Sequence, residues 1–233
     1  IAKLKGVGIV SIIDHSDNNA THHGIDEESM NNVDVCIDFT NPNAVINNIQ
    51  KISKFKKNIV VGTTGWYGKL EEAKKIVNRS NLGFIYASNF SIGVNIFFKI
   101  IENAAKIINK IEDYDIYGYE LHHNQKIDRP SGTAKTIGNI LIKRIKRKNK
   151  LLFDKIDRKI KSNELNISSI RAGFIPGTHV VGFDSSADSI ELKHTARNRE
   201  GFALGAIMAA QWINGKKGFY NIDDMVESIF WVD

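Results

Sequence analysis

The stretch VDVCIDFTNPNAVINNIQKISKFKKNIVVGTT (Val33–Thr64) combines two strand patterns with one helix pattern. Val33–Phe39 and Ile59–Val61 are short runs of apolar and β-branched residues, which are typical of strands buried on both faces. Between them, a helix predicted to begin at Asn41-Pro42 places valine and isoleucine on one face. Strand, helix and strand in this order predict a βαβ unit and therefore a parallel sheet.

The same alternation continues on both sides of this stretch. Val7–Ile13 and Leu82–Ala87 are further strand-like runs, and Lys69–Ser80 has helical periodicity after the turn GTTGWYG. The predicted fold class is therefore α/β, with a Rossmann-like parallel sheet. Such sheets bind ligands at the carboxyl ends of their strands.

Asp14 follows the predicted strand Val7–Ile13. In a dinucleotide-binding unit, an acidic residue that holds the ribose lies about 20 residues after a glycine-rich turn. Counting back from Asp14 places that turn before Ile1, so we expect the first strand and the glycine-rich loop to be missing from the sequence. Without them, the chain as given is expected to bind a dinucleotide poorly, because a helix N-terminus is needed for the pyrophosphate.

The pattern changes after Asn89. A helix (Ile92–Ile108), a strand (Ile116–His122) and a second helix (Ser131 to about Lys146) come first. Three strand-like runs with hairpin-sized spacings follow: SSIRAGFI (Ser168–Ile175), THVVGFD (Thr178–Asp184) and SIELKHTA (Ser189–Ala196). This predicts a second α/β domain with a mixed sheet. The last helix, Phe202–Ile213, is rich in alanine and glycine, which suits close packing.

Composition excludes several classes of protein. The chain has 233 residues, of which 42% are hydrophobic and 25% charged, and its apolar runs fall short of the roughly 18 residues of a membrane span. The single cysteine, Cys36, lies in an apolar run, which favours a buried thiol over redox chemistry. The net charge of +6 includes the run Lys143–Lys150, which is interpreted as a solvated helix end and not as a nucleic-acid surface. A cytoplasmic protein without membrane or nucleic-acid partners is therefore expected.

The stretch YELHHNQKIDRPSGTA (Tyr119–Ala134) has the composition of a site. It places His122 and His123 at the end of a predicted strand, Lys126 in the following loop, and Ser131 before a predicted helix. Histidine exchanges protons near neutral pH, and a lysine beside a helix N-terminus attracts anions. A histidine pair near a lysine and a helix cap predicts a site that binds an anion and transfers a proton.

These motifs together resemble the 4-hydroxy-tetrahydrodipicolinate reductase (dihydrodipicolinate reductase) family, which acts in the diaminopimelate route to lysine. The resemblance begins with Glu120–His123, Lys126, Asp128 and Pro130–Ala134. It extends in order through CIDFTNP (Cys36–Pro42), VGTTGW (Val61–Trp66), SNFSIGVN (Ser88–Asn95), RAGFIPGTH (Arg171–His179) and HTARNREGFALGA (His194–Ala206).

The resemblance implies a domain organisation and a set of partners. Residues 1–90 and 200–233 are expected to form the dinucleotide-binding domain, and residues 91–199 an inserted domain for substrate binding and tetramerisation. The implied cofactor is NADH or NADPH, the implied substrate is a small dicarboxylate, and the implied assembly is a homotetramer. Because the hydride chemistry belongs to the nicotinamide, no metal is expected.

The resemblance also implies roles for individual residues. The resemblance implies that His122 and Lys126 are catalytic: His122 is similar to the acid that protonates the substrate, and Lys126 is similar to a group that also binds substrate beside the reacting atoms. The other implied substrate-binding residues are His123, Ser131, Gly132 and Thr133. The implied cofactor-binding residues are Asp14, Gly62, Thr63, Thr64, Ala87, Ser88, Asn89, Phe90 and Arg199.

Two other functions remain open on the sequence. One is a different Rossmann dehydrogenase that acts on an amino acid or a semialdehyde. The other is a degenerate, non-catalytic relative that binds a dinucleotide, for which the missing glycine-rich turn is the support. Turnover that depends on a nicotinamide cofactor separates both from the reductase.

Overall fold

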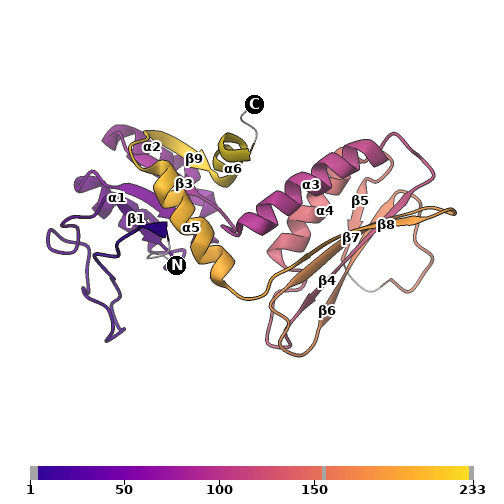
Figure 1. Cartoon of the computed structure of the whole chain (residues 1–233), viewed down its shortest axis with the longest axis horizontal. Helices are drawn as coiled ribbons and strands as arrows, with labels where there is room; N and C mark the ends of the chain where they lie inside the picture. Colours follow the sequence, from indigo (N-terminus) through magenta and orange to yellow (C-terminus); the bar gives the residue numbers. More distant parts are fainter. Residues whose placement is uncertain (1–4, 154–155, 231–233) are drawn as a thin grey trace. The chain divides into compact units, whose positions relative to one another are not determined.

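The computed structural model describes residues 5–153 and 156–230. The chain divides into two compact units (Figure 1). The first unit comprises Ile1–Ile92 and Phe202–Asp233, and the second comprises Gly93–Gly201. Each unit has its own sheet, so each is described by itself.

The first unit contains a parallel sheet in the order β1-β2-β3-β9. Its strands are β1 (Val35–Asp38), β2 (Asn58–Val61), β3 (Gly83–Tyr86) and β9 (Gly218–Asn221). Its helices are α1 (Val45–Lys54), η2 (Tyr67–Lys69), α2 (Leu70–Ser80), α5 (Glu200–Ile213) and α6 (Ile222–Phe230). The predicted βαβ alternation of Val33–Thr64 is confirmed, although α1 begins at Val45 because Asn41 first caps a turn through its side chain.

Both faces of this sheet are covered, as the continuous apolar strands predict. In β2, Ile59 and Val61 pack against α1 and α2, whereas Val60 packs against α5. The alanine- and glycine-rich composition of α5 permits this contact. A Cβ atom at Gly205 would lie 1.7 Å from the backbone oxygen of Phe90, so only glycine allows so close an approach.

The predicted strand Val7–Ile13 is wrong. This run makes no ladder with the sheet, and its pairing is limited to an isolated bridge between Ile13 and His22. Ile9 is 68% exposed and Val10 is 52% exposed. A strand is stable only when a neighbouring strand satisfies its backbone groups, and in residues 5–153 and 156–230 no strand pairs with this run. Its apolar, β-branched composition was therefore a misleading signal.

The second unit contains a mixed sheet in the order β5-β6-β4-β7-β8. Its strands are β4 (Asp115–His122), β5 (Lys150–Leu152), β6 (Glu164–Arg171), β7 (Thr178–Asp184) and β8 (Ser189–Thr195). β4 is parallel to β6 and antiparallel to β7, which is also antiparallel to β8. Helices α3 (Ile92–Ile108) and α4 (Gly132–Arg144) cover one face (Figure 1), where residues such as Ile101, Leu141 and Phe183 form the core.

Several boundaries in this unit differ from those predicted. The run Ser168–Ile175 was expected as a strand, whereas β6 begins at Glu164 and ends at Arg171. Residues after Arg171 leave the sheet because they form a turn that pairs with the loop after β4. The strand β5 was not predicted, and it shares only Lys150 with the basic run Lys143–Lys150.

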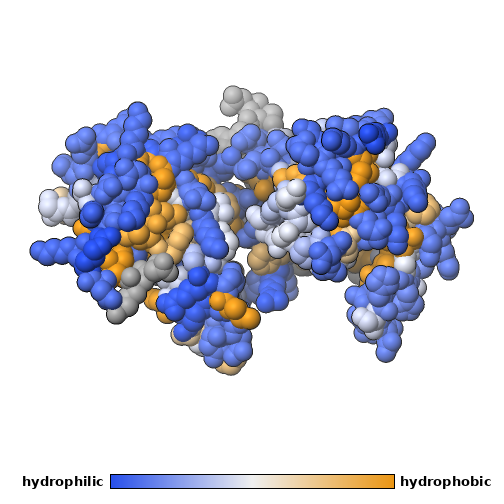
Figure 2. All heavy atoms as spheres, turned by 180° about the vertical axis from the view of Figure 1, so that it is seen from behind, coloured by the Kyte–Doolittle hydropathy of each residue, from blue (hydrophilic) through white to orange (hydrophobic). Residues whose placement is uncertain are grey.

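Hydrophobic atoms reach the surface in separate patches on both units, with hydrophilic side chains between them (Figure 2). Among the described residues, the helices are too short or too polar to cross a membrane.

Candidate active site

The carboxyl end of β4 carries the central residues of the site. The side chains of β4 alternate between the two faces of the sheet, and Glu120 and His122 lie on the face covered by helices. The side chain of Glu120 is completely buried and His122 is 6% exposed. A buried carboxylate must be paired with hydrogen-bond donors, so its neighbours define the chemistry of the site.

The register of the sheet brings these neighbours from distant parts of the sequence. Ser169 of β6 and His179 of β7 are the residues paired directly with Glu120. Arg171 lies opposite His122 and reaches the same carboxylate. Glu120 Oε1 accepts hydrogen bonds from Arg171 Nη2 at 2.9 Å, Ser169 Oγ at 2.8 Å and the backbone N–H of Ser131 at 3.0 Å.

The second carboxylate oxygen lies between two imidazole rings. Glu120 Oε2 is 3.5 Å from Nδ1 of His122 and 3.4 Å from Nε2 of His179. The two rings meet edge to face with their centroids 5.1 Å apart. We call Glu120, His122, His179 and Arg171 the buried carboxylate cluster.

Burial and charge set the protonation states of this cluster. Burial acts to raise the pKa of Glu120, but hydrogen bonds from His179, Ser131, Arg171 and Ser169 hold it far below its usual range. Burial also lowers the pKa of His122 to about 4, although the Glu120 carboxylate opposes that change. Glu120 is therefore ionised and His122 is neutral at pH 7 in this structure.

The loop after β4 carries Lys126 close to the cluster. The backbone of this loop is held against the turn after β6 by hydrogen bonds from His123 N to Ile175 O at 2.8 Å and from Asn124 N to Gly173 O at 3.2 Å. Lys126 Nζ is 2.6 Å from Asp128 Oδ1, and the side chain of Asp128 is 55% exposed. Partial burial raises the pKa of Asp128, but the hydrogen bond from Lys126 and its charge outweigh this and lower it. The lysine therefore has an exposed, replaceable anionic partner.

Ser131 links the cluster to the start of α4. Its hydroxyl accepts a hydrogen bond from Ala134 N at 3.1 Å, which is an N-cap, and lies 3.2 Å from His179 Nε2. The backbone N–H of Ser131 donates to Glu120. Ser131 therefore has a structural role, because it both caps α4 and binds the buried carboxylate. Gly132 and Thr133 lie in the first turn of α4, where backbone N–H groups have no acceptor within the helix. These N–H groups can therefore bind an anion.

The predicted cofactor loop Gly62–Thr64 follows β2 at the carboxyl end of the parallel sheet. Thr63 is buried, and its hydroxyl donates to Asp38 Oδ1 at 2.9 Å and accepts from Thr40 N at 2.8 Å. Thr63 therefore fixes the loop from inside, whereas Thr64 is exposed. A Cβ atom at Gly62 would lie 2.1 Å from the ring of Phe39, so any larger residue there would have to displace that exposed ring.

The other predicted cofactor residues lie in different surroundings. Ala87 and Phe90 follow β3, beside the Gly62 loop, but their side chains are buried in the core, so that only their backbone could meet a ligand. Ser88 is exposed and Asn89 is half-buried. Arg199 is exposed and belongs to the second unit.

Asp14 does not end a sheet strand, contrary to expectation. Its carboxylate oxygen Oδ1 accepts hydrogen bonds from the N–H of Ser16 at 2.8 Å and of Asp17 at 3.1 Å, which forms a tight turn. These bonds lower the pKa of Asp14, which is fully exposed. A role for Asp14 at a ribose stays a prediction.

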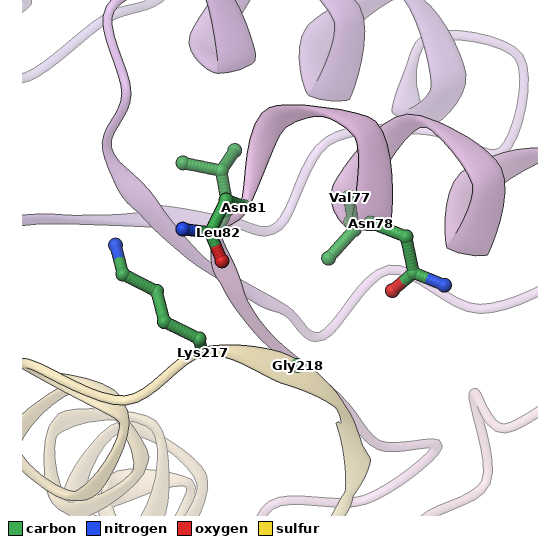
Figure 3. Close-up of a pocket in the computed structure, with 6 residues that line it drawn as sticks. All are labelled: Val77, Asn78, Asn81, Leu82, Lys217 and Gly218. Atoms are coloured by element: carbon green, nitrogen blue, oxygen red, sulfur yellow. The ribbon is translucent and has the colours of Figure 1, made fainter.

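A shallow hollow of about 300 Å³ lies at the other end of the parallel sheet (Figure 3). Its lining includes Asn81 and Leu82, which precede β3, and Lys217 and Gly218, where β9 begins. Ligands of open parallel sheets bind at the carboxyl ends of the strands. The hollow is at the amino ends, so we do not assign it to the cofactor.

The buried carboxylate cluster also has donor atoms suited to a metal ion. Ligand atoms of Glu120, His122 and His179 lie within 4.8 Å of one another. However, the guanidinium of Arg171 already binds the carboxylate at 2.9 Å, and its positive charge opposes a divalent cation. We therefore assign the cluster to proton and anion chemistry.

Glu120, Arg171 and His179 are functional residues for which no role was predicted from the sequence. All three occur in the motifs Glu120–His123 and RAGFIPGTH (Arg171–His179). The available signal was Glu120, a charged residue two positions before His122 in a predicted strand, where both side chains lie on the same face. Its partners could be found only from the strand register.

Comparison with known proteins covers both units. Residues 2–90 match the family model for the N-terminus of dihydrodipicolinate reductase, and residues 93–226 match the model for its C-terminus. The 4-hydroxy-tetrahydrodipicolinate reductase of Buchnera aphidicola subsp. Schizaphis graminum is 40% identical over 237 residues, covering 99% of this chain and 82% of that protein. The reductase of the same name from Christiangramia forsetii is 39% identical over 198 residues, covering 85% of this chain and 81% of that protein.

A solved structure has the same fold. The dipicolinate-bound dihydrodipicolinate reductase from Paenisporosarcina sp. TG-14 matches with a TM-score of 0.67 at 24% sequence identity. The match covers 82% of this chain and 73% of that chain. The predicted α/β fold, with a parallel sheet and a mixed sheet, is thereby confirmed.

Proposed function

The chain belongs to the dihydrodipicolinate reductase family, and we propose that it is an oxidoreductase that uses NADH or NADPH in the diaminopimelate route to lysine. In this proposal it reduces 4-hydroxy-tetrahydrodipicolinate, by way of dihydrodipicolinate, to tetrahydrodipicolinate. The observation that carries the proposal is the buried carboxylate cluster, which sets His122 beside the Lys126 loop and the start of α4.

The substrate in this proposal carries two carboxylates, which need positive charge and N–H donors. Lys126 offers a compact charge whose present partner, Asp128, is more than half exposed and can be displaced. Gly132 and Thr133 offer backbone N–H groups at the positive end of α4. His123, which is half-buried and next to His122, supplies a further donor. These groups suit a planar dicarboxylate.

His122 supplies the proton. When bound, the nicotinamide supplies a hydride to one atom of the substrate. A second atom of the substrate then needs a proton from an acid. His122 is neutral at pH 7 in the absence of substrate, because burial lowers its pKa to about 4. Two substrate carboxylates beside the ring favour the charged imidazole and raise that pKa toward neutrality. Substrate binding therefore prepares the acid that the reaction needs.

The residues of the first unit fit a dinucleotide at the carboxyl end of the parallel sheet. Gly62 and Thr64 present backbone and an exposed hydroxyl, and the Ala87–Phe90 turn lies on the neighbouring strand. The internal bond between Thr63 and Asp38 holds the first of these loops in place. Asp14 and Arg199 are proposed as further contacts on family membership alone.

We expect the full-length protein to oxidise the reduced nicotinamide only when the condensation product of aspartate semialdehyde and pyruvate is supplied. The reason is that the Lys126 loop and the start of α4 match a dicarboxylate. The measurement is the decrease in absorbance of the reduced nicotinamide after the freshly made condensation product is added.

The control for this experiment is a set of other keto acids, amino acids and semialdehydes at the same concentration. Consumption of the nicotinamide with one of these, and none with the condensation product, would support a different dehydrogenase. No consumption with any of them would support the non-catalytic alternative.

We also expect NADH to be used at least as well as NADPH. Preference for the 2′-phosphate usually depends on a cation beside the ribose-binding acid. Asp14 is followed by His15 and not by an arginine or a lysine. The ratio of kcat/KM for the two cofactors at pH 7.5 tests this. A ratio that favours NADPH by more than about tenfold contradicts it, since that corresponds to 1.4 kcal/mol of discrimination.

We propose further that the protein works in the cytoplasm as a homotetramer. The face of the second-unit sheet opposite α3 and α4 (Figure 1) carries Tyr119, Leu121 and Ile170, and Ile170 is 46% exposed. The exposed apolar side chain of Ile170, beside polar residues such as Ser168 on the same face, suits a contact with another copy of the chain. Cys36, whose thiol pKa is raised to about 12 by burial, is compatible with a reducing compartment.

A further inference from the structure

We propose that Glu120 is a positioning residue for His122. Through its oxygen Oε2, it keeps a proton on Nδ1 of His122, so that the other nitrogen, Nε2, is the atom that gives a proton to the substrate. This inference rests on the proposed reductase function and deepens it.

The two oxygens of Glu120 have different tasks. Oε1 accepts from Arg171, Ser169 and the N–H of Ser131, which fixes the plane of the carboxylate. Oε2 is buried and has none of these donors. Nδ1 of His122 lies 3.5 Å from Oε2, and Nε2 of His179 lies 3.4 Å from it. A buried oxygen of this kind needs a donor, and a protonated imidazole nitrogen supplies one.

The two nitrogens of His122 are also in different surroundings. Nδ1 is fully buried and lacks a partner other than Oε2. The exposed 8% of the side chain therefore lies at atoms other than Nδ1. Nε2 lies beside Gly177, where an added Cβ atom would be only 3.1 Å from it. The glycine leaves room at this nitrogen, so a substrate reaches Nε2 and not Nδ1.

The charges around His122 are consistent with this arrangement. His122 faces Glu120 on its own strand, His179 on β7, Arg171 on β6 and Lys126 in the following loop. Among these, Glu120 is the group that favours a positive charge on the ring, while the others oppose it. When His122 takes up a second proton at Nε2, the carboxylate beside Nδ1 therefore stabilises the imidazolium that donates to the substrate.

Glu120→Gln tests the assignment directly. The amide keeps the shape of the carboxylate and retains an oxygen for Arg171, Ser169 and Ser131. Its NH₂ group then takes the place of Oε2 and donates to Nδ1. We expect neutral His122 to carry its proton on Nδ1 in the wild type and on Nε2 in the variant. Nitrogen NMR of histidine-labelled protein without substrate measures the tautomer.

Kinetics provide the second readout. The altered tautomer and the lost negative charge are expected to lower kcat roughly 10-fold to 1,000-fold, with a smaller change in KM. Glu120→Asp, which keeps the charge, is expected to retain the Nδ1–H tautomer and to recover part of kcat. If Glu120→Gln fails to fold, the wild-type tautomer and Glu120→Asp still decide the question.

Glu164→Gln is a matched control. Glu164 is a carboxylate of the same sheet, only 1% exposed, and is paired with Arg158 at 2.7 Å and Lys150 at 3.4 Å. It is expected to leave the His122 tautomer and kcat unchanged. A wild-type proton on Nε2, or the same tautomer in Glu120→Gln as in the wild type, overturns the proposal. Because NMR needs no turnover, an enzyme that shows the tautomer switch but does not reduce the condensation product contradicts the proposed function alone.

Discussion

Replacing His122 with glutamine is expected to lower kcat roughly 100-fold to 10,000-fold, the usual contribution of a general acid. Glutamine keeps the approximate size and a hydrogen-bonding group but has no proton to give at neutral pH. Glu120 and Arg171 remain paired in the variant, so the buried carboxylate cluster is expected to stay folded. The KM for substrate is expected to change less, because His122 acts on the reacting atoms and Lys126 binds the carboxylate.

The pH dependence of wild-type turnover is a second test of the acid role of His122. The pKa of His122 is about 4 in the free protein, and an acid loses activity as pH rises through its pKa. The profile of kcat/KM reports the free enzyme, and that of kcat reports the substrate complex. We therefore expect the limb that falls with rising pH to lie at a higher pH for kcat than for kcat/KM.

The measurement is steady-state kinetics from about pH 3 to pH 9, so that the scan includes the pKa of about 4 in the free protein, with circular dichroism to check folding. His122→Gln is expected to lose that limb altogether. Near wild-type turnover in the variant would remove His122 from the acid role and leave the proton to another group or to water.

The alternation of strands and helices in the first unit was predictable from the sequence because it depends on local patterns. Runs such as Ile59–Val61 are buried on both faces, so they are apolar without interruption. The failure at Val7–Ile13 has a physical cause, since composition cannot show whether a strand finds a neighbour to pair with. β9 has only four residues and is half-buried throughout, so its pattern is too weak to predict.

In the candidate site, too, some residues could be predicted from the sequence and others could not. His122, Lys126 and Ser131 lie within one short stretch, so their proximity could be read from the sequence. Arg171 and His179 come from two other strands, and their contact with Glu120 depends on the register of β4 with β6 and β7. A shift of one residue would turn these side chains to the opposite face of the sheet. The sequence predicts the residue types but not this register.

Lys126→Ala is expected to damage both binding and turnover, in contrast to His122→Gln. The ammonium group holds a substrate carboxylate in the ground state and offsets negative charge that develops as hydride adds. We expect KM to rise and kcat to fall by roughly 100-fold to 1,000-fold, the usual cost in kcat of removing one preorganised donor. The measurement is initial rates over a range of substrate concentrations at saturating cofactor.

Asp128→Asn is the matched control for this substitution. Asp128 is the present partner of Lys126, at 2.6 Å, and it competes with the substrate carboxylate for the ammonium group. Removing its charge is expected to leave kcat near the wild-type value and to lower KM or leave it unchanged, which is opposite to Lys126→Ala. Since the side chain of Asp128 is 55% exposed, its substitution is expected to have little effect on folding. If Lys126→Ala keeps the wild-type KM, the lysine does not bind the substrate carboxylate, and the positive end of α4 must hold it instead.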